Sequence, residues 1–147
     1  EFGLQDFGLY GNLSVLETES DFRTHIDNVV QGKGLWPSLL ILDWRVPWTR
    51  PAKEMPECPD EVKNDGYHEN AGRRCFEYLR AAEKSVESKV QRVTSVLFYS
   101  ILHKDDIFGR LAEKGYTPQG GKFGYFSKEE SGDHLKLEQT IQMLLQH

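Results

Sequence analysis

Three short apolar runs constrain the fold of this chain more than any other feature of its sequence. The clearest is Leu-Leu-Ile-Leu at residues 39–42, and residues 93–100 and 122–128 are also rich in apolar and aromatic side chains. A short run with little polar alternation is typical of a strand that is buried on both faces. We therefore expect three core strands in a sheet that helices cover on both sides.

Segments with helical periodicity lie between and around these runs. The first begins at a cap, Ser20 or Asp21, and ends at Gly32, and a short strand is expected before it at residues 12–20. Further helices are expected at residues 70–87, at residues 105–115 with Asp105 or Asp106 as the cap, and near the C-terminus, where Leu137, Ile141, Leu144 and Leu145 form an apolar stripe. This alternation predicts an α/β fold with a doubly wound parallel sheet.

The polar stretch at residues 48–70 interrupts the alternation. It contains Pro51, Pro56, Pro59 and Gly66, and residues of this kind break helices and strands. We expect a long inserted loop here, within a single domain that spans residues 1–147.

Composition and charge narrow the class of protein. A net charge of −5 gives no reason to expect nucleic-acid binding, and no apolar run is long enough to cross a membrane. The N-terminus lacks the layout of a signal peptide, and two cysteines are too few for a disulfide framework. We expect a cytoplasmic protein with reduced thiols, whose partner is another protein or a small anion.

Polar side chains stand where the three best strands end. Asp43, Ser100 and Lys128 follow or close these strands. In a parallel sheet all three ends open on one edge, where α/β proteins place their ligands. The sequence therefore predicts that an acid, a hydroxyl and an amine converge, with Asp43 and Lys128 close enough to pair.

With Asp43, Ser100 and Lys128 at the ends of its expected strands, the chain resembles the receiver domains of bacterial two-component response regulators. The segment DWRVP is similar to the end of the acceptor strand, with Asp43 as acceptor and Pro47 at the usual proline position. VLFYS, which ends at Ser100, resembles the fourth receiver strand, and GYFSK, which ends at Lys128, resembles the fifth. Gly72 matches the glycine of the helix that follows the acceptor loop.

The resemblance implies a flavodoxin-like fold and a phosphoryl switch. Asp43 would accept a phosphoryl group from a histidine kinase or a small phosphodonor, and Lys128 would bind its oxygens. Ser100 would move to hydrogen-bond the same oxygens, and Tyr125 would act as the switch aromatic. The protein would then be a signalling domain that acts on an output protein, and its only chemistry would be self-catalysed phosphoryl transfer.

The resemblance also implies a Mg²⁺ site, but this sequence lacks a clear match to some of the ligands. Its ligands would be Asp43, the backbone carbonyl of Arg45 and an acidic pair that receivers carry at the end of their first strand. By spacing, residues 12–32 match the second strand and helix of a receiver, so the first strand and helix would be missing or altered. In a rival alignment residues 15–23 supply the first strand and helix start, with Glu17 or Glu19 in place of the acidic pair.

This departure from the family pattern affects metal binding and assembly. Metal binding should be weak or absent, since a hard dication needs several carboxylates. An incomplete sheet should favour a homodimer, through the exposed sheet edge or the apolar stripe of the last helix. Glu129 stands where the family usually has a proline, so an atypical receiver is expected.

Two other functions remain open. A pseudo-receiver would keep the fold as a protein-interaction module without the phosphoryl cycle. A metal-dependent nuclease is more remote: Asp43, Glu61 and Lys63 have suitable residue types, but Glu61 and Lys63 lie in the breaker-rich stretch instead of a strand.

Overall fold

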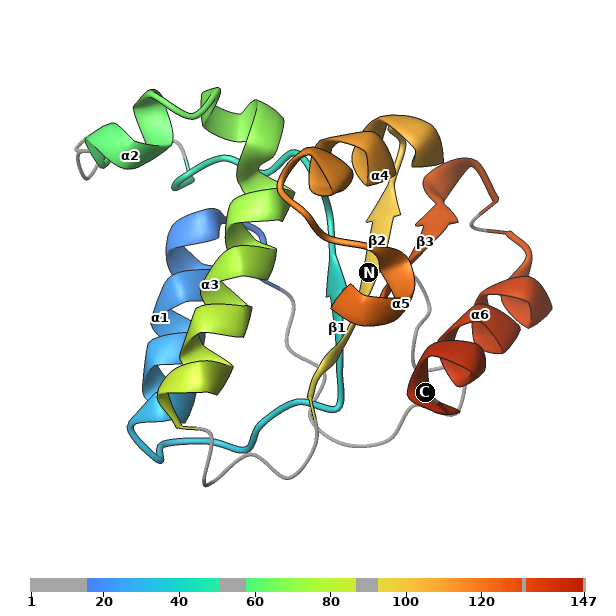
Figure 1. Cartoon of the computed structure of the whole chain (residues 1–147), viewed down its shortest axis with the longest axis horizontal. Coiled ribbons are helices and arrows are strands. Elements are labelled where there is room, and N and C mark those ends of the chain that lie inside the picture. Colours follow the sequence, from blue (N-terminus) through green and yellow to red (C-terminus); the bar gives the residue numbers. More distant parts are fainter. Residues whose placement is uncertain (1–15, 51–57, 87–92, 131, 147) are drawn as a thin grey trace.

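A computed structural model gives the architecture of residues 16–50, 58–86, 93–130 and 132–146. Three parallel strands form one sheet in the order β1 (Leu39–Leu42), β2 (Ser95–Ser100) and β3 (Phe123–Ser127). Leu42 lies opposite Phe98, and Phe98 lies opposite Tyr125. The three core strands and their parallel pairing are as the sequence predicts (Figure 1).

Burial of the strands on both faces is confirmed for β2 alone. Every residue of β2 is buried, whereas Leu39, Leu40 and Ile41 of β1 are half-buried. Three of the five residues of β3 are also half-buried. The reason is position: β1 and β3 are the outer strands of the described sheet, and an outer strand has a neighbour on one side.

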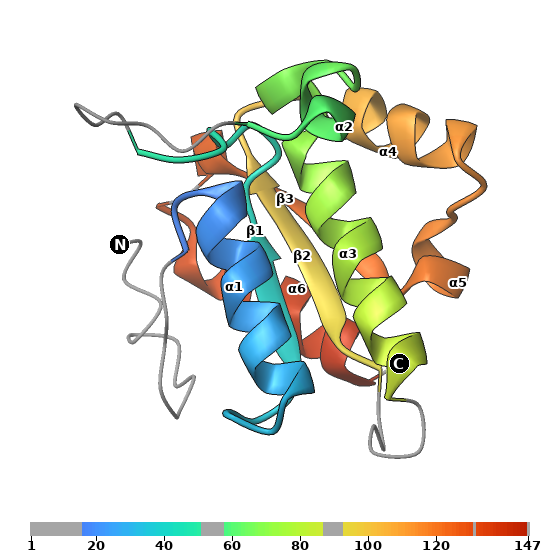
Figure 2. The ribbon, with the colours of Figure 1, turned by 90° about the vertical axis from the view of Figure 1, so that its left-hand side faces the viewer.

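Helices cover both faces of the sheet, and three of them share one face. They are α1 (Glu19–Val30), α3 (Ala71–Ser85) and α4 (Lys104–Glu113). Side chains from these helices meet one face of the strands in a core that includes Phe22, Ile26, Phe76, Leu79, Phe98, Ile107 and Leu111. Figure 2 shows α1 and α3 side by side in front of the strands.

Helix α6 (His134–Gln146) packs on the opposite face, behind the strands in Figure 2. Leu137 and Ile141 are buried there against Leu97, Tyr99 and Phe126, and Leu144 and Leu145 pack against the same cluster. The predicted apolar stripe of this helix therefore packs on the sheet, whereas Leu135 and Met143 of the same helix are 66% and 64% exposed.

The start of the first helix differs from the sequence prediction. Its N-cap is Thr18, whose hydroxyl accepts a hydrogen bond from the Asp21 amide, so neither Ser20 nor Asp21 is the cap. The expected strand at residues 12–20 is wrong for its last residues, because Glu19 and Ser20 are already helical. Residues 12–15 lie outside the described part.

Helix α4 is also capped differently from the prediction. The N-cap is His103, and neither Asp105 nor Asp106 has this role. The His103 Nδ1 accepts a hydrogen bond from the Asp105 amide. Histidine is not among the usual capping residues, so no local sequence signal pointed to it.

Part of the predicted loop at residues 48–70 is helical. It contains α2 (Asp60–Lys63) and the 3-10 turn η2 (Tyr67–Asn70), while residues 51–57 lie outside the described part. Val62 of α2 is buried, which anchors the segment to the domain. Two more short elements were not expected, α5 (Pro118–Gly121) and the turn η4 (Lys128–Glu130). Among the described helices, none is both long and apolar enough to cross a bilayer.

Candidate functional site

Asp43 and Lys128 meet at the edge where the parallel strands end. Asp43 directly follows β1, and Lys128 directly follows β3. The Lys128 Nζ donates to Asp43 Oδ2 at 2.5 Å, and the two side chains are 27% and 30% exposed. The Lys128 Nζ also lies over the ring of Tyr99 in the middle strand, 5.9 Å from the ring centroid. The predicted pairing of these two residues is confirmed.

Ser100 closes β2 at the same edge and is almost fully buried. Its hydroxyl accepts a hydrogen bond from the Leu102 amide at 3.1 Å, within the turn that leads to α4. The Tyr125 hydroxyl donates to the carbonyl of the same residue, Leu102, at 2.5 Å. Ser100 and Tyr125 were separate candidates in the sequence. In the structure they bind the same residue, Ser100 at the Leu102 amide and Tyr125 at the Leu102 carbonyl.

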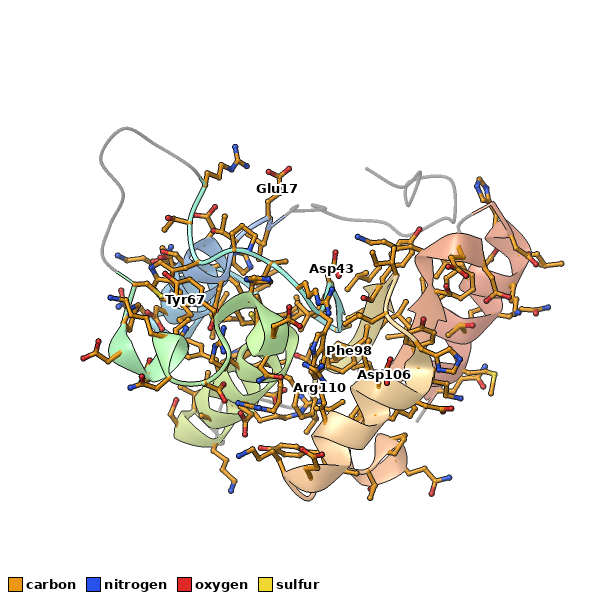
Figure 3. All side chains as sticks on the ribbon, turned by 90° about the horizontal axis from the view of Figure 1, so that it is seen from above. Glu17, Asp43, Tyr67, Phe98, Asp106 and Arg110 are labelled. Carbon is orange, nitrogen blue, oxygen red and sulfur yellow. The ribbon has the colours of Figure 1, made fainter. Side chains whose placement is uncertain are left out.

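The acidic residues expected near a metal have other partners. Glu17 is exposed and pairs with Arg50 at 2.8 Å, and Figure 3 shows it apart from Asp43. The carboxylate of Glu19 is buried against Arg74, at 2.8 and 2.9 Å, and also accepts from Arg23. The side chain of Arg45 pairs with Glu69 at 2.9 Å.

The partners of Glu17 and Glu19 make a Mg²⁺ site that includes these carboxylates hard to form. Within the described ranges, no three side chains of histidine, cysteine, aspartate or glutamate come together as metal ligands. A hard dication prefers several oxygen ligands, and the donor set around Asp43 has one carboxylate with a lysine ammonium beside it. The described residues therefore do not fit a tightly bound Mg²⁺.

A buried network of charges joins α1 to the start of α3, and sequence reasoning missed it. Arg74 binds Glu19 of α1 and also the carboxylate and carbonyl of Asp65. Arg73 binds the same carboxylate. Burial opposes ionisation of Asp65, but the hydrogen bonds from both arginines outweigh it and lower its pKa. Two adjacent arginines at a helix start usually face solvent, so the sequence contains no signal of this network.

Trp44, the residue after Asp43, anchors the segment that follows β1 in the core. Its side chain is fully buried and meets the Phe98 ring edge-on, with centroids 5.5 Å apart. The Gly72 amide donates to the Trp44 carbonyl at 2.7 Å. A Cβ at position 72 would lie 2.8 Å from the Trp44 Cα, so the start of α3 can approach this closely because residue 72 is glycine.

The nuclease alternative lacks its structural context. Glu61 and Lys63 lie on the short helix α2, not on a strand, and Glu61 pairs with Arg23 at 2.8 Å. The Arg23 guanidinium also lies 5.1 Å from the ring centroid of Trp48 and 5.0 Å from that of Tyr78. This packing fixes the segment after β1 against α1 and α3.

No family model, curated protein or solved structure matches this chain. The choice between the functions left open therefore depends on the geometry of the Asp43 site.

Proposed function

We propose that this chain is a receiver-like signalling domain in which Asp43 accepts a phosphoryl group and thereby switches a protein–protein interaction. The observation that carries this proposal is the 2.5 Å contact between Asp43 Oδ2 and Lys128 Nζ at the ends of two parallel strands, with Ser100 closing the strand between them. A partly exposed carboxylate supplies the nucleophile, and a fixed ammonium supplies positive charge for the incoming oxygens.

The order of the elements supports a flavodoxin-like arrangement. Strands β1, β2 and β3 are adjacent and parallel, as are the last three strands in the 2-1-3-4-5 order of this fold. The crossover helices α3 and α4 lie on one face, as right-handed connections would place them, and α6 covers the other. Helix α1 packs beside α3, which is the position of the second helix of a receiver and favours the alignment that assigns residues 12–32 to the second strand and helix.

The chemistry needs few participants from this chain. An Asp43 oxygen attacks the phosphorus of a phosphohistidine or an acyl phosphate, an O–P bond forms, and the bond to the leaving group breaks. With phosphohistidine the P–N bond breaks and the leaving imidazole takes up a proton; with an acyl phosphate the P–O bond breaks and the acyl group leaves as a carboxylate. Lys128 would then bind the new phosphoryl oxygens in place of the Asp43 carboxylate.

The contacts of Leu102 offer a route from this event to the surface. If the Ser100 hydroxyl turns toward the phosphoryl group, the Leu102 amide loses its acceptor. The turn before α4 then rearranges. Leu102 moves with it, and its carbonyl is the acceptor for the Tyr125 hydroxyl. A change of charge at Asp43 would thus alter the surface formed by α4 and β3, where an output protein could bind.

One observation favours the pseudo-receiver as a second candidate. The described residues around Asp43 do not provide the carboxylates that Mg²⁺ requires, and without a dication the transfer is slow. In that case the domain would bind its partner regardless of phosphorylation.

Acetyl phosphate and beryllium fluoride, each with and without millimolar Mg²⁺, would distinguish the two. We expect intact-mass analysis to detect addition of one phosphoryl group to the wild-type chain and none to Asp43→Asn. We also expect a weak dependence on Mg²⁺, with little change in tryptophan fluorescence when Mg²⁺ is added alone. Asp106→Asn, which alters an exposed aspartate of α4, is the matched control and should behave as wild type.

Two results would count against phosphoryl transfer. The first is an unmodified wild-type chain whose amide resonances do not respond to either reagent, which would leave the pseudo-receiver. The second is modification that persists in Asp43→Asn, which would place the acceptor elsewhere.

A further inference from the structure

The orientation of the Asp43 carboxylate depends on the residue that follows it. While Oδ2 accepts from Lys128, Oδ1 accepts a hydrogen bond from the backbone amide of Trp44 at 2.7 Å. The peptide between Asp43 and Trp44 therefore fixes which oxygen faces the lysine. Any group that holds Trp44 also holds this carboxylate.

Glu69 of the turn η2 is such a group. The Trp44 indole Nε1 donates to the carbonyl oxygen of Glu69 at 2.7 Å. The carboxylate of Glu69 pairs with Arg45, so the backbone and the side chain of one residue bind the two positions that follow Asp43. The turn thereby determines the path of the chain directly after the acceptor.

The same carbonyl has a second donor, which comes from α4. Arg110 Nη1 donates to the Glu69 carbonyl at 2.8 Å and to Asn70 Oδ1 at 3.0 Å. In Figure 3, Arg110 extends from α4 toward the segment that carries η2 and α3. A carbonyl oxygen has two lone pairs and can accept two hydrogen bonds. The Glu69 carbonyl accepts one from Trp44, just after β1, and one from Arg110 of α4.

We propose that Arg110 is a positioning residue for Asp43, acting through the Glu69 carbonyl and Trp44. This inference deepens the proposed function and rests on it where phosphoryl transfer is concerned. Arg110 fixes η2, η2 fixes the Trp44 indole, and the Trp44 amide orients the Asp43 carboxylate. Coupling between two sites is reciprocal, so a ligand on Asp43 must also bias the position of α4.

This route is separate from the one through Leu102. Ser100 and Tyr125 contact the turn before α4, whereas Arg110 lies in the second half of α4 and contacts η2. Leu102, just before α4, thus contacts Ser100 and Tyr125, while Arg110 within α4 is linked through Glu69 to Trp44. A partner that bound α4 could in this way change the reactivity of Asp43.

The test replaces the guanidinium while keeping an apolar side chain of similar length. Arg110→Met removes both hydrogen bonds, and Arg110→Lys should restore one of them. Arg80→Met is the matched control, because Arg80 is also half-buried and donates to a backbone carbonyl, that of Gly121, at 2.8 Å, and to Glu83. It joins α3 to α5, and its hydrogen-bond acceptors do not include Asp43, Trp44 or Arg45.

The first readout is the pair of Trp44 resonances in ¹H–¹⁵N spectra, the indole N–H and the backbone amide. We expect Arg110→Met to shift both and to speed hydrogen exchange of the amide, Arg110→Lys to shift them less, and Arg80→Met to leave them unchanged. The second readout is the rate of modification by acetyl phosphate, which should fall roughly three- to tenfold in Arg110→Met, as expected for one weakened hydrogen bond.

The two readouts separate the possible failures. If acetyl phosphate does not modify the wild-type chain, the proposed function fails, while the Trp44 resonances still test the positioning role. If the Trp44 amide is unchanged in Arg110→Met, the positioning role is wrong. If Arg110→Met does not fold, Asn70→Ala and Arg110→Lys test the same link; a Trp44 amide unchanged in both would equally overturn it.

Discussion

The ammonium of Lys128 lies 2.5 Å from the carboxylate of Asp43, although the two residues are 85 positions apart and follow strands, β3 and β1, that do not pair with each other. Both side chains remain about one-quarter to one-third exposed, so water and ligands can reach the pair. An ion pair of this kind can be opened at small cost, and the proposed function needs this, because Lys128 would exchange the Asp43 carboxylate for a phosphoryl group.

A double-mutant cycle measures that cost. We expect Asp43→Asn and Lys128→Gln to show a coupling free energy of no more than about 1 kcal/mol in urea denaturation, because partly exposed ion pairs contribute little. A coupling of several kcal/mol would mean that the pair is a structural element of the sheet edge, and the signalling role would lose its main support.

The ion pair between Glu19 and Arg74 should behave in the opposite way. Both side chains are buried, so Arg74→Met leaves the Glu19 carboxylate to its weaker, more exposed pairing with Arg23. We expect a loss of about 3–5 kcal/mol in the free energy of unfolding, and a smaller combined loss when Glu19→Gln is added. The control Arg50→Gln breaks an exposed pair with Glu17 and should cost less than about 1 kcal/mol. Equal losses in Arg74→Met and Arg50→Gln would contradict the burial of the network.

Gly72→Ala should destabilise the protein by about 1–3 kcal/mol, because the new Cβ would lie 2.8 Å from Trp44 and force α3 away from the end of β1. Gly109→Ala is the matched control. Its Cβ would meet nothing within 4 Å, and in the interior of α4 alanine should stabilise by about 0.5–1 kcal/mol. Thermal unfolding of both variants would check the difference in sign, and similar effects of the two substitutions would argue against close packing of Trp44 on α3.

Acid should weaken the protein partly through Asp65. Despite the opposing effect of burial, Arg73 and Arg74 lower the pKa of this carboxyl below its ordinary value of 3.8 in the folded chain. A lowered pKa contributes stability above the ordinary value, and this contribution is lost as the pH falls through the folded value. In urea denaturation, wild type and Asp65→Asn should therefore differ at pH 6 and converge as the pH falls from about 5 to about 2. A difference that stayed constant over this range would refute the shift.

Self-association through the outer edge of β1 is the last prediction. Among the described residues no strand pairs with this edge, and β1 contains no charge or proline that would discourage pairing. We expect a dimer at micromolar concentration in sedimentation equilibrium, and a shift toward monomer in Leu39→Lys. A mass of one chain at all concentrations would show that the sheet needs no second copy.

The sequence alone was sufficient to predict the three strands and the polar residues at their ends. The apolar runs identified β1, β2 and β3, because burial between helices leaves a local pattern that does not depend on the rest of the chain. Parallel strands end on one edge, so the meeting of Asp43 and Lys128 could be inferred from the same pattern. The sequence predicted the first helix but misplaced its cap, since Thr18, Ser20 and Asp21 all have suitable side chains.

Tertiary structure decided which polar side chains belong together. Glu19 was a candidate metal ligand in the sequence, but packing of α1 against α3 places it on Arg74, which is 55 positions away. The half-burial of β1 depends on its place in the sheet, and the helical turns within residues 58–70 depend on contacts such as that of Arg110 with Glu69. Such pairings join distant segments, and their energies arise only when folding brings the segments together, so no local pattern encodes them.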